Sequence, residues 1–166
     1  MKLLDRRYQL IDFGMGRKLE SLAGYVVDRP SPAAVGAVQR SPARWKHAAA
    51  TYDADKRVWE YRQPWPAGLA VDCGLFRMLI RPTPYGHIGL FPEQHQNWRW
   101  LGDCSENTDM DLVESKTALN LFAYTGASTM ALACAGFAVA HVDAAKPNVQ
   151  SARLAAEEND LGEAAI

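Results

Sequence analysis

The order of strand-like and helix-like segments between residues 117 and 166 most constrains what this chain can fold into. Residues 117–124 form an apolar segment typical of a buried strand, in which Leu119, Leu121 and Phe122 are the apolar residues. After Gly126, the alanine-rich segment 127–135 predicts a helix that ends at Gly136. A second strand at 137–143, a second helix at 146–159 and the start of a third strand at 162–166 are predicted to follow.

Strands that alternate with helices over short turns predict parallel strands joined by right-handed crossovers. The fold class expected is therefore α/β, with a Rossmann-like, doubly wound sheet. A parallel sheet needs covering on both faces, and two strands with two helices cannot supply that cover. Either the preceding β segments complete the layer or the sheet is incomplete and the chain is the front portion of a longer protein. We prefer the second interpretation.

The first 83 residues have a different character and predict a β-rich region. Strands are expected in YQLIDFG and the segment after it, in AGYVVDRP, and on both sides of a hairpin turn at residues 54–56. A further pair of strands is predicted to meet near Cys73 and Gly74, whereas residues 31–48 are rich in Pro, Ala and Ser and indicate a connecting loop. Pro92 opens a short predicted helix. We therefore expect two domains, a β-rich region at 1–83 and the α/β region at 84–166.

Charge is distributed unevenly along the chain, although the net charge is only −1. Residues 1–66 contain 12 Lys and Arg against 7 Asp and Glu, and the remaining residues contain 6 against 12. Such an asymmetry is typical of proteins that present a basic region to a nucleic acid, so RNA is a candidate partner of the N-terminal region. The opposing interpretation is a scatter of cations over a solvated surface, because strong phosphate binding needs clustered cations.

The remaining composition favours a cytoplasmic protein with reduced thiols. The N-terminus has no apolar run after its basic residues, and the longest apolar run, 131–140, is about half of the ~20 residues that a membrane span needs. Three widely spaced cysteines without a CxxC pair argue against a disulfide framework and a zinc site. Cys134 is expected in the core of the first α/β helix, since free cysteine is commonly buried.

Two residues at the carboxyl ends of the predicted parallel strands point to a nucleoside site. Gly126 allows a close approach of the backbone, and Asp143 ends the next strand, where a carboxylate can accept hydrogen bonds from ribose hydroxyls. Each residue alone also has a purely structural interpretation, as a turn glycine and as a charge at a helix N-terminus. One glycine is a poor cradle for a pyrophosphate, so the pair favours a nucleoside cofactor without phosphates over a dinucleotide.

LNLFAYTGAS followed by HVDAAKPNVQSARLAAEENDL, with GLFPEQHQNW upstream, resembles class I S-adenosylmethionine (SAM)-dependent methyltransferases. More narrowly, these segments are similar to the family that methylates carbon 5 of cytosine in large-subunit ribosomal RNA. The resemblance covers roughly residues 86–161, and it implies SAM as the cofactor. By position, it implies cofactor contacts from three segments. These are Phe91, Glu93 and Gln94; Phe122, Ala123, Tyr124, Thr125, Gly126, Ala127 and Ser128; and Asp143 with Ala144.

The sequence also departs from this family. Pro92 replaces an aliphatic residue, while His95 and Trp98 stand where the family has arginines. The first 80 residues do not resemble the RNA-binding domain found at the start of some members. The family's catalytic residues lie beyond the second helix, so no catalytic residue is predicted within 1–166, and this chain alone is expected to be inactive. An NAD- or FAD-dependent oxidoreductase and a non-catalytic nucleoside-binding module remain as alternatives.

Overall fold

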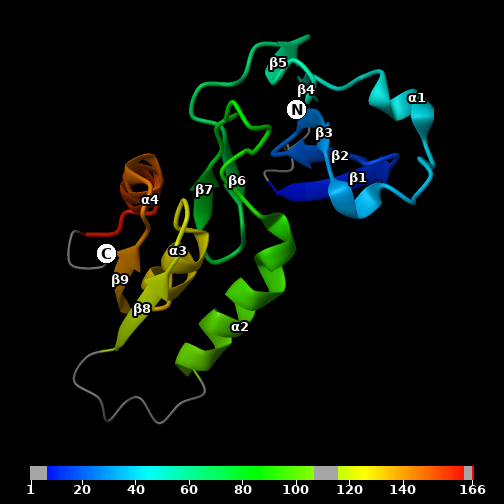
Figure 1. The fold of residues 1–166 in the computed structure, drawn as a ribbon. Coiled ribbons are helices and arrows are strands. Elements are labelled where there is room, and N and C mark those ends of the chain that lie inside the picture. The colour runs from blue at the N-terminus through cyan, green and yellow to red at the C-terminus, as the bar shows by residue number, and fades with distance from the viewer. Residues whose placement is uncertain (1–6, 107–115, 163–165) are drawn as a thin grey trace, which may run out of the picture. The chain divides into compact units, whose positions relative to one another are not determined.

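The structure, a computed structural model, describes residues 7–106, 116–162 and 166 (Figure 1). The chain divides into two compact units. The first comprises the residues up to Val71 together with Ile80–Ile88, and the second comprises Asp72–Leu79 together with the residues from Gly89 onward.

A five-stranded sheet forms the first unit. Its strands are β1 (Tyr8–Gly14), β2 (Arg17–Leu22), β3 (Tyr25–Pro30), β4 (Ala50–Asp53) and β5 (Val58–Tyr61), which lie in this order across the sheet. The β3–β4 pair is parallel and the other pairs are antiparallel. Leu22 and Val27 are fully buried on one face of β2 and β3, where Leu22 lies opposite Tyr25, and Leu19 is fully buried on the other face, because successive side chains of a strand alternate between faces. The predicted β-rich region and its hairpin turn at residues 54–56 are thus confirmed.

The connection between β3 and β4 contains two short helical turns, η1 (Pro32–Ala34) and α1 (Pro42–Trp45). The carboxylate of Asp12, a buried residue of β1, fixes this connection. It accepts hydrogen bonds from the backbone N–H of Arg40 at 3.2 Å and of Ser41 at 2.9 Å, and from Nε1 of Trp45 at 2.8 Å. One carboxylate therefore holds a loop that has little regular structure of its own.

The hydrogen bond from Trp45, with those from the backbone, lowers the pKa of Asp12 from 3.8 to about 2. The unfolded chain therefore binds a proton more readily than the folded chain between these two values. The stability that Asp12 contributes is complete above about pH 4 and is lost as the pH falls towards 2. We expect Asp12→Asn to lower the melting temperature at pH 7. We also expect the melting temperature of this variant to decrease less than that of the unaltered protein between pH 4 and pH 2. Thermal unfolding at several pH values tests this, and parallel acid profiles for both proteins would contradict it.

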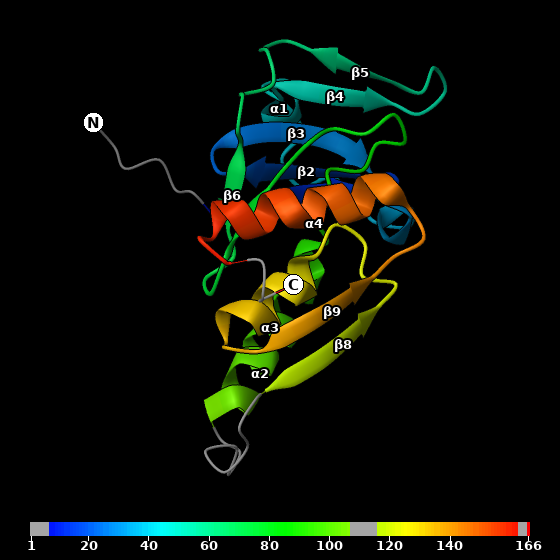
Figure 2. The ribbon, with the colours of Figure 1, turned by 90° about the vertical axis from the view of Figure 1, so that its left-hand side faces the viewer.

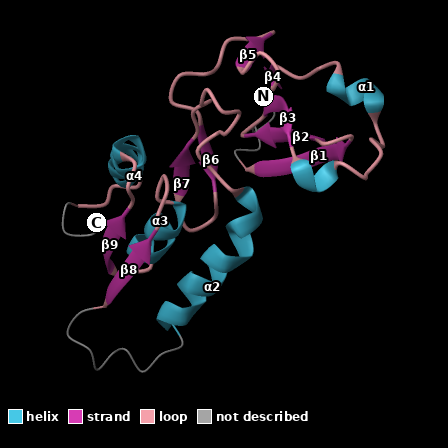
Figure 3. Cartoon of the chain, viewed as in Figure 1, coloured by secondary structure: helices cyan, strands magenta, loops and turns pink. Residues whose placement is uncertain are grey.

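In the second unit, helices and parallel strands alternate. Its elements from Gly89 onward are η2 (Pro92–Gln94), α2 (His95–Glu106), β8 (Thr117–Leu121), α3 (Ala127–Cys134), β9 (Ala138–Val142) and α4 (Lys146–Glu158), so that α2, α3 and α4 all belong to this unit (Figure 3). The short strands β6 (Ala70–Asp72) and β7 (Arg77–Leu79) pair where the chain passes between the units. The β8–β9 pair is parallel, from Thr117 opposite Ala138 to Leu121 opposite Val142, and Figure 2 shows both arrows running in the same direction. The predicted α/β class with its β-rich N-terminal part is confirmed. Most of the third predicted strand, 163–165, lies outside the described residues.

The prediction that residues 117–124 form a buried strand is wrong. Leu119 is 63% exposed, Leu121 54% and Phe122 92%. Side chains alternate across β8 and β9: Val139 is buried and Asn120 half-buried on one face, and the other face carries the exposed residues. Helix α3 packs on these two strands, but among the described residues nothing buries the opposite, apolar face.

Cys134 was expected in the core and is instead exposed. It is the last residue of α3, whereas Met130 and Ala131 of the same helix are fully buried. The last turn of this apolar helix is thus only partly covered, since Ala133 is buried and Cys134 beside it is not.

Candidate functional site

A cleft of about 280 Å³ lies in the second unit, between the start of α2 and the turn that joins β8 to α3. Its wall on the α2 side consists of Leu90, Phe91, Glu93, Gln94 and Trp98. The opposite wall consists of Asn120, Phe122, Ala123, Tyr124, Thr125, Ala127 and Ser128. The lining is mostly apolar and aromatic with a few polar groups, which is typical of small-molecule sites.

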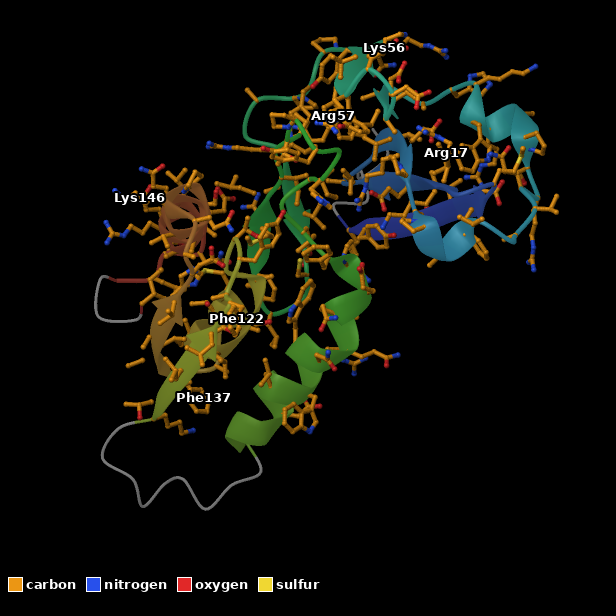
Figure 4. All side chains as sticks on the ribbon, viewed as in Figure 1. Arg17, Lys56, Arg57, Phe122, Phe137 and Lys146 are labelled. Carbon is orange, nitrogen blue, oxygen red and sulfur yellow. The ribbon has the colours of Figure 1, made fainter. Side chains whose placement is uncertain are left out.

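The turn between β8 and α3 has a strained backbone. Phe122 and Tyr124 adopt φ values of 53° and 52°, a region that residues with side chains rarely occupy, and Gly126 has φ 97°. Phe122 projects from the end of β8 and is 92% exposed (Figure 4). The ring of Tyr124 lies 5.2 Å from that of Phe91, centroid to centroid, so that two aromatic rings meet across the cleft. Such strain persists only where surrounding contacts enforce it, and it concentrates at functional sites.

Three hydrogen bonds hold this turn in place. Ala123 N–H donates to the carbonyl of Val142 at 3.0 Å and Tyr124 N–H to Oδ2 of Asp143 at 2.8 Å. The buried hydroxyl of Thr125 donates to the carbonyl of Gly89 at 2.6 Å, which attaches the turn to the segment that leads into η2. The hydroxyl of Thr125 therefore links one wall of the cleft to the backbone that leads into the other.

Asp143, directly after β9, is half-buried and accepts three hydrogen bonds. Besides Tyr124, its Oδ1 accepts from Ala145 N–H at 2.9 Å and from Nδ2 of Asn148 at 3.0 Å. These hydrogen bonds, of which the one from Ala145 has the largest effect, hold the pKa of Asp143 below its usual 3.8. The side chain is therefore ionised at neutral pH. A carboxylate offers about four lone pairs, so Oδ2 can accept one further hydroxyl while all three bonds remain.

Gly126 allows α4 to pack closely against the start of α3, in addition to giving the turn its shape. A Cβ at this position would lie 2.8 Å from Cβ and 3.3 Å from Cα of Ala152 in α4, which is too close for any side chain. The sequence suggested that the missing side chain lets a ligand approach. The structure shows instead that the space is taken by α4, and Gly126 does not line the cleft.

A polar network lies behind the turn. Nδ2 of Asn120 donates to Oγ1 of Thr129 at 2.9 Å, and the same hydroxyl lies 2.9 Å from Nδ1 of His141. Thr129 is fully buried. Burial lowers the pKa of His141, and the charge of Asp143 and the backbone of Tyr124 oppose this in part. This network connects β8, α3 and β9 and fixes the side chain of Asn120 at the cleft.

Nine of the twelve site residues predicted from the sequence line the cleft together: Phe91, Glu93, Gln94, Phe122, Ala123, Tyr124, Thr125, Ala127 and Ser128. The other three, Gly126, Asp143 and Ala144, are not part of its wall, although Asp143 is bonded to that wall through Tyr124. Sequence reasoning missed Leu90, Trp98 and Asn120 as lining residues. The position of polar Asn120 between the apolar residues Leu119 and Leu121, near the end of the predicted strand, is a sequence signal that could have found it.

Neither described thiol has the properties of a nucleophile. Burial raises the pKa of Cys73 to about 12, and partial desolvation of the sulfur raises that of Cys134 above its usual 9 although the residue is exposed. Among the described residues, no group of three or more His, Cys, Asp or Glu side chains is arranged to hold a metal ion. Nor does any helix in 7–106 or 116–162 have the length and apolarity to cross a bilayer.

No protein-family model matches this sequence, and no curated protein does. Among solved structures, the chain is similar to a SAM-dependent methyltransferase from Agrobacterium tumefaciens, with 33% sequence identity and a TM-score of 0.85. The match covers 96% of this chain and 50% of that protein. The chain therefore has the mixed α/β fold of SAM-dependent methyltransferases over about half of their length.

Two further solved structures share the fold at 19% identity. One is a protein from Streptococcus mutans, described as a SAM-dependent methyltransferase, with a TM-score of 0.69 over 98% of this chain and 44% of that one. The other is SMU.776, described as a methyltransferase and complexed with S-adenosylhomocysteine (SAH), with a TM-score of 0.65 and the same coverage of both chains. At this level of identity the likeness concerns the fold alone.

Proposed function

We propose that the chain forms the SAM-binding part of a methyltransferase. The observation that carries this proposal is the cleft beside the β8–α3 turn, with the ionised carboxylate of Asp143 at the neighbouring strand end. The Agrobacterium methyltransferase, at 33% identity, supports it. At about 280 Å³ the cleft lies near the lower end of the volumes of small-molecule sites, roughly 300–1,000 Å³, so it accommodates only part of such a cofactor.

The residues present fit a nucleoside that carries an amino acid. Phe91 and Tyr124 offer aromatic faces, and Glu93, Gln94 and Ser128 offer polar groups for the amino-acid end. Oδ2 of Asp143 can accept one ribose hydroxyl, and a second hydroxyl requires Asn148 to release Oδ1. Bound there, SAM would supply an electrophilic methyl group, while these residues hold and orient it. A dinucleotide fits less well, because the turn has a single glycine and its Cβ position is filled by α4.

We also propose that the methyl acceptor is RNA, with ribosomal RNA cytosine as the first candidate. Several cations of the first unit are paired with acids: Arg17 with Asp28, Arg29 with Glu20, and Lys56 with Asp53 and Glu60. Arg40, Arg44 and Lys46 differ, because all three are exposed, none forms an ion pair with a described residue, and they follow one another along the connection that Asp12 fixes. A cluster of exposed cations on a fixed loop is suited to phosphates.

A combined variant, Arg44→Ala with Lys46→Ala, tests the RNA proposal in the complete gene product. We expect RNA affinity to fall by about three- to tenfold at low salt and the salt dependence of binding to become shallower, since each cation that contacts a phosphate releases about one counterion. Lys56→Ala is the control, because Lys56, labelled in Figure 4, is exposed but already neutralised by Asp53 and Glu60.

Transfer of a labelled methyl group from SAM to ribosomal RNA should fall in the first variant and not in the control. Equal RNA binding by all three proteins would contradict the assignment of this surface. Methyl transfer to a non-RNA acceptor only would contradict the RNA proposal while leaving SAM binding intact.

The apolar face of β8 and β9 is uncovered in the described residues, so we expect residues 1–166 alone to be inactive.

A further inference from the structure

Trp98 of α2 combines deep burial with an unsatisfied polar atom. The residue is 3% exposed and lines the cleft, and its Nε1 is buried without a hydrogen-bond partner in the part of the chain that the structure describes. Its ring packs edge-on against Phe76 at 5.3 Å and against His95 at 6.5 Å, centroid to centroid. These contacts hold the ring in place, but its N–H donates no hydrogen bond to any described residue.

The other tryptophans of this chain show how unusual this is. Nε1 of Trp45 donates to Asp12 at 2.8 Å, that of Trp59 to the carbonyl of Thr83 at 2.8 Å, and that of Trp65 to the carbonyl of Ile80 at 3.2 Å. Trp100 is 64% exposed and can donate to water. Trp98 is therefore the exception among five. An indole N–H can only donate, and a buried donor without an acceptor destabilises the protein, so the N–H of Trp98 needs an acceptor that the described residues do not supply.

The charges of the cleft indicate what that acceptor is. Among the described residues that line the cleft, Glu93 is the only charged one, and none is Lys, Arg or His. Some of the remaining polar groups are already engaged, since Oε1 of Gln94 accepts from Asn97 at 2.6 Å and Nδ2 of Asn120 donates to Thr129. A ligand carboxylate that enters this cleft therefore meets a neutral donor and not a cation.

We propose that the Nε1–H of Trp98 binds the ligand by donating a hydrogen bond to the carboxylate at the amino-acid end of the bound nucleoside. This inference rests on the proposed function, because it assigns a recognition role within the same cleft. Nε1 is closed to water in the ligand-free protein, so the proposal requires that a neighbouring group move aside when the carboxylate enters. Trp98 acts in binding and takes no part in a chemical step.

The test compares two ligands that differ in the amino-acid end. SAH carries the carboxylate, and 5′-methylthioadenosine has the same nucleoside and sulfur without it. In the complete gene product, we expect Trp98→Phe to weaken SAH binding about tenfold and to leave 5′-methylthioadenosine binding within about twofold, as measured by calorimetry. Trp100→Phe makes the same chemical change at an exposed position of the same helix and should alter neither affinity.

Phenylalanine is smaller than tryptophan, so a second variant removes the donor without changing the size of the ring. Replacement of Trp98 by benzothienylalanine, in which sulfur takes the place of the N–H, should give the same selective loss of SAH affinity. An equal loss for both ligands in this variant, or no loss for SAH, would overturn the proposal. If the unaltered protein binds 5′-methylthioadenosine and SAH equally well, the carboxylate is not recognised and the Trp98 proposal fails while the nucleoside site stands. If it binds neither ligand, the proposed function itself fails.

Discussion

Gly126→Ala should destabilise the second unit by about 2–4 kcal/mol, the sum of overpacking and backbone strain. The added Cβ would lie 2.8 Å from Cβ of Ala152, a residue with 1% exposure in the middle of α4. A helix backbone 3.3 Å away cannot yield as a flexible side chain would. The φ of 97° adds strain of its own, because L-residues rarely adopt it. Chemical denaturation followed by circular dichroism measures the loss.

Two comparisons separate these causes. Gly136 also has a positive φ, 89°, but a Cβ there would meet nothing within 4 Å, so Gly136→Ala should cost only about 1–2 kcal/mol from backbone strain. Adding Ala152→Gly to Gly126→Ala removes the clash, and we expect it to restore at least about 1 kcal/mol relative to the sum of the single changes. Equal effects of the two glycine substitutions, with no rescue, would show that contact with α4 is not what requires glycine at position 126.

Asp143→Ala should reduce SAH affinity by about 30-fold or more, because it removes a charged acceptor for the ribose and an anchor of the cleft wall at once. The alanine variant cannot accept from Tyr124 N–H, so the strained turn loses one of the three hydrogen bonds described above that tie it to neighbouring segments. Isothermal titration with SAH, combined with a thermal unfolding curve to check that the variant is folded, measures the effect.

Asn148→Ala is the matched control for this change. It removes only one of the three donors to Asp143 and leaves the carboxylate and the bond from Tyr124 in place. We expect SAH affinity to change by no more than about threefold. An Asp143→Ala protein that binds SAH as well as the Asn148→Ala protein does would refute a ribose-binding role for Asp143.

The elements of the second unit follow closely from local signals in the sequence. The predicted helix at 146–159 is observed as Lys146–Glu158, and the one at 127–135 as Ala127–Cys134. Pro147 near the start of one helix and Gly136 after the other are signals that act within a few residues, so no knowledge of the tertiary fold is needed to interpret them. The parallel pairing of β8 and β9 then follows from the order of the elements.

Features that depend on distant neighbours were not predictable in this way. An apolar composition marks Leu119 and Leu121 as candidates for burial, but burial depends on whether another layer covers that face of the sheet. The role of Gly126 depends on Ala152, which is 26 positions later in the sequence. The sequence marks Trp98 only as a residue that stands where the family has an arginine, and the structure is needed to show that its N–H lacks an acceptor among the described residues.

The central claim is that the cleft beside the β8–α3 turn binds a nucleoside cofactor without phosphates. Calorimetric titration of the complete gene product with SAH, and in parallel with NAD⁺, tests it most directly. We predict one SAH bound per chain, competition by SAM for the same site, and no measurable heat with NAD⁺. Binding of NAD⁺ in preference to SAH, or the absence of SAH binding by a folded protein, would contradict the claim.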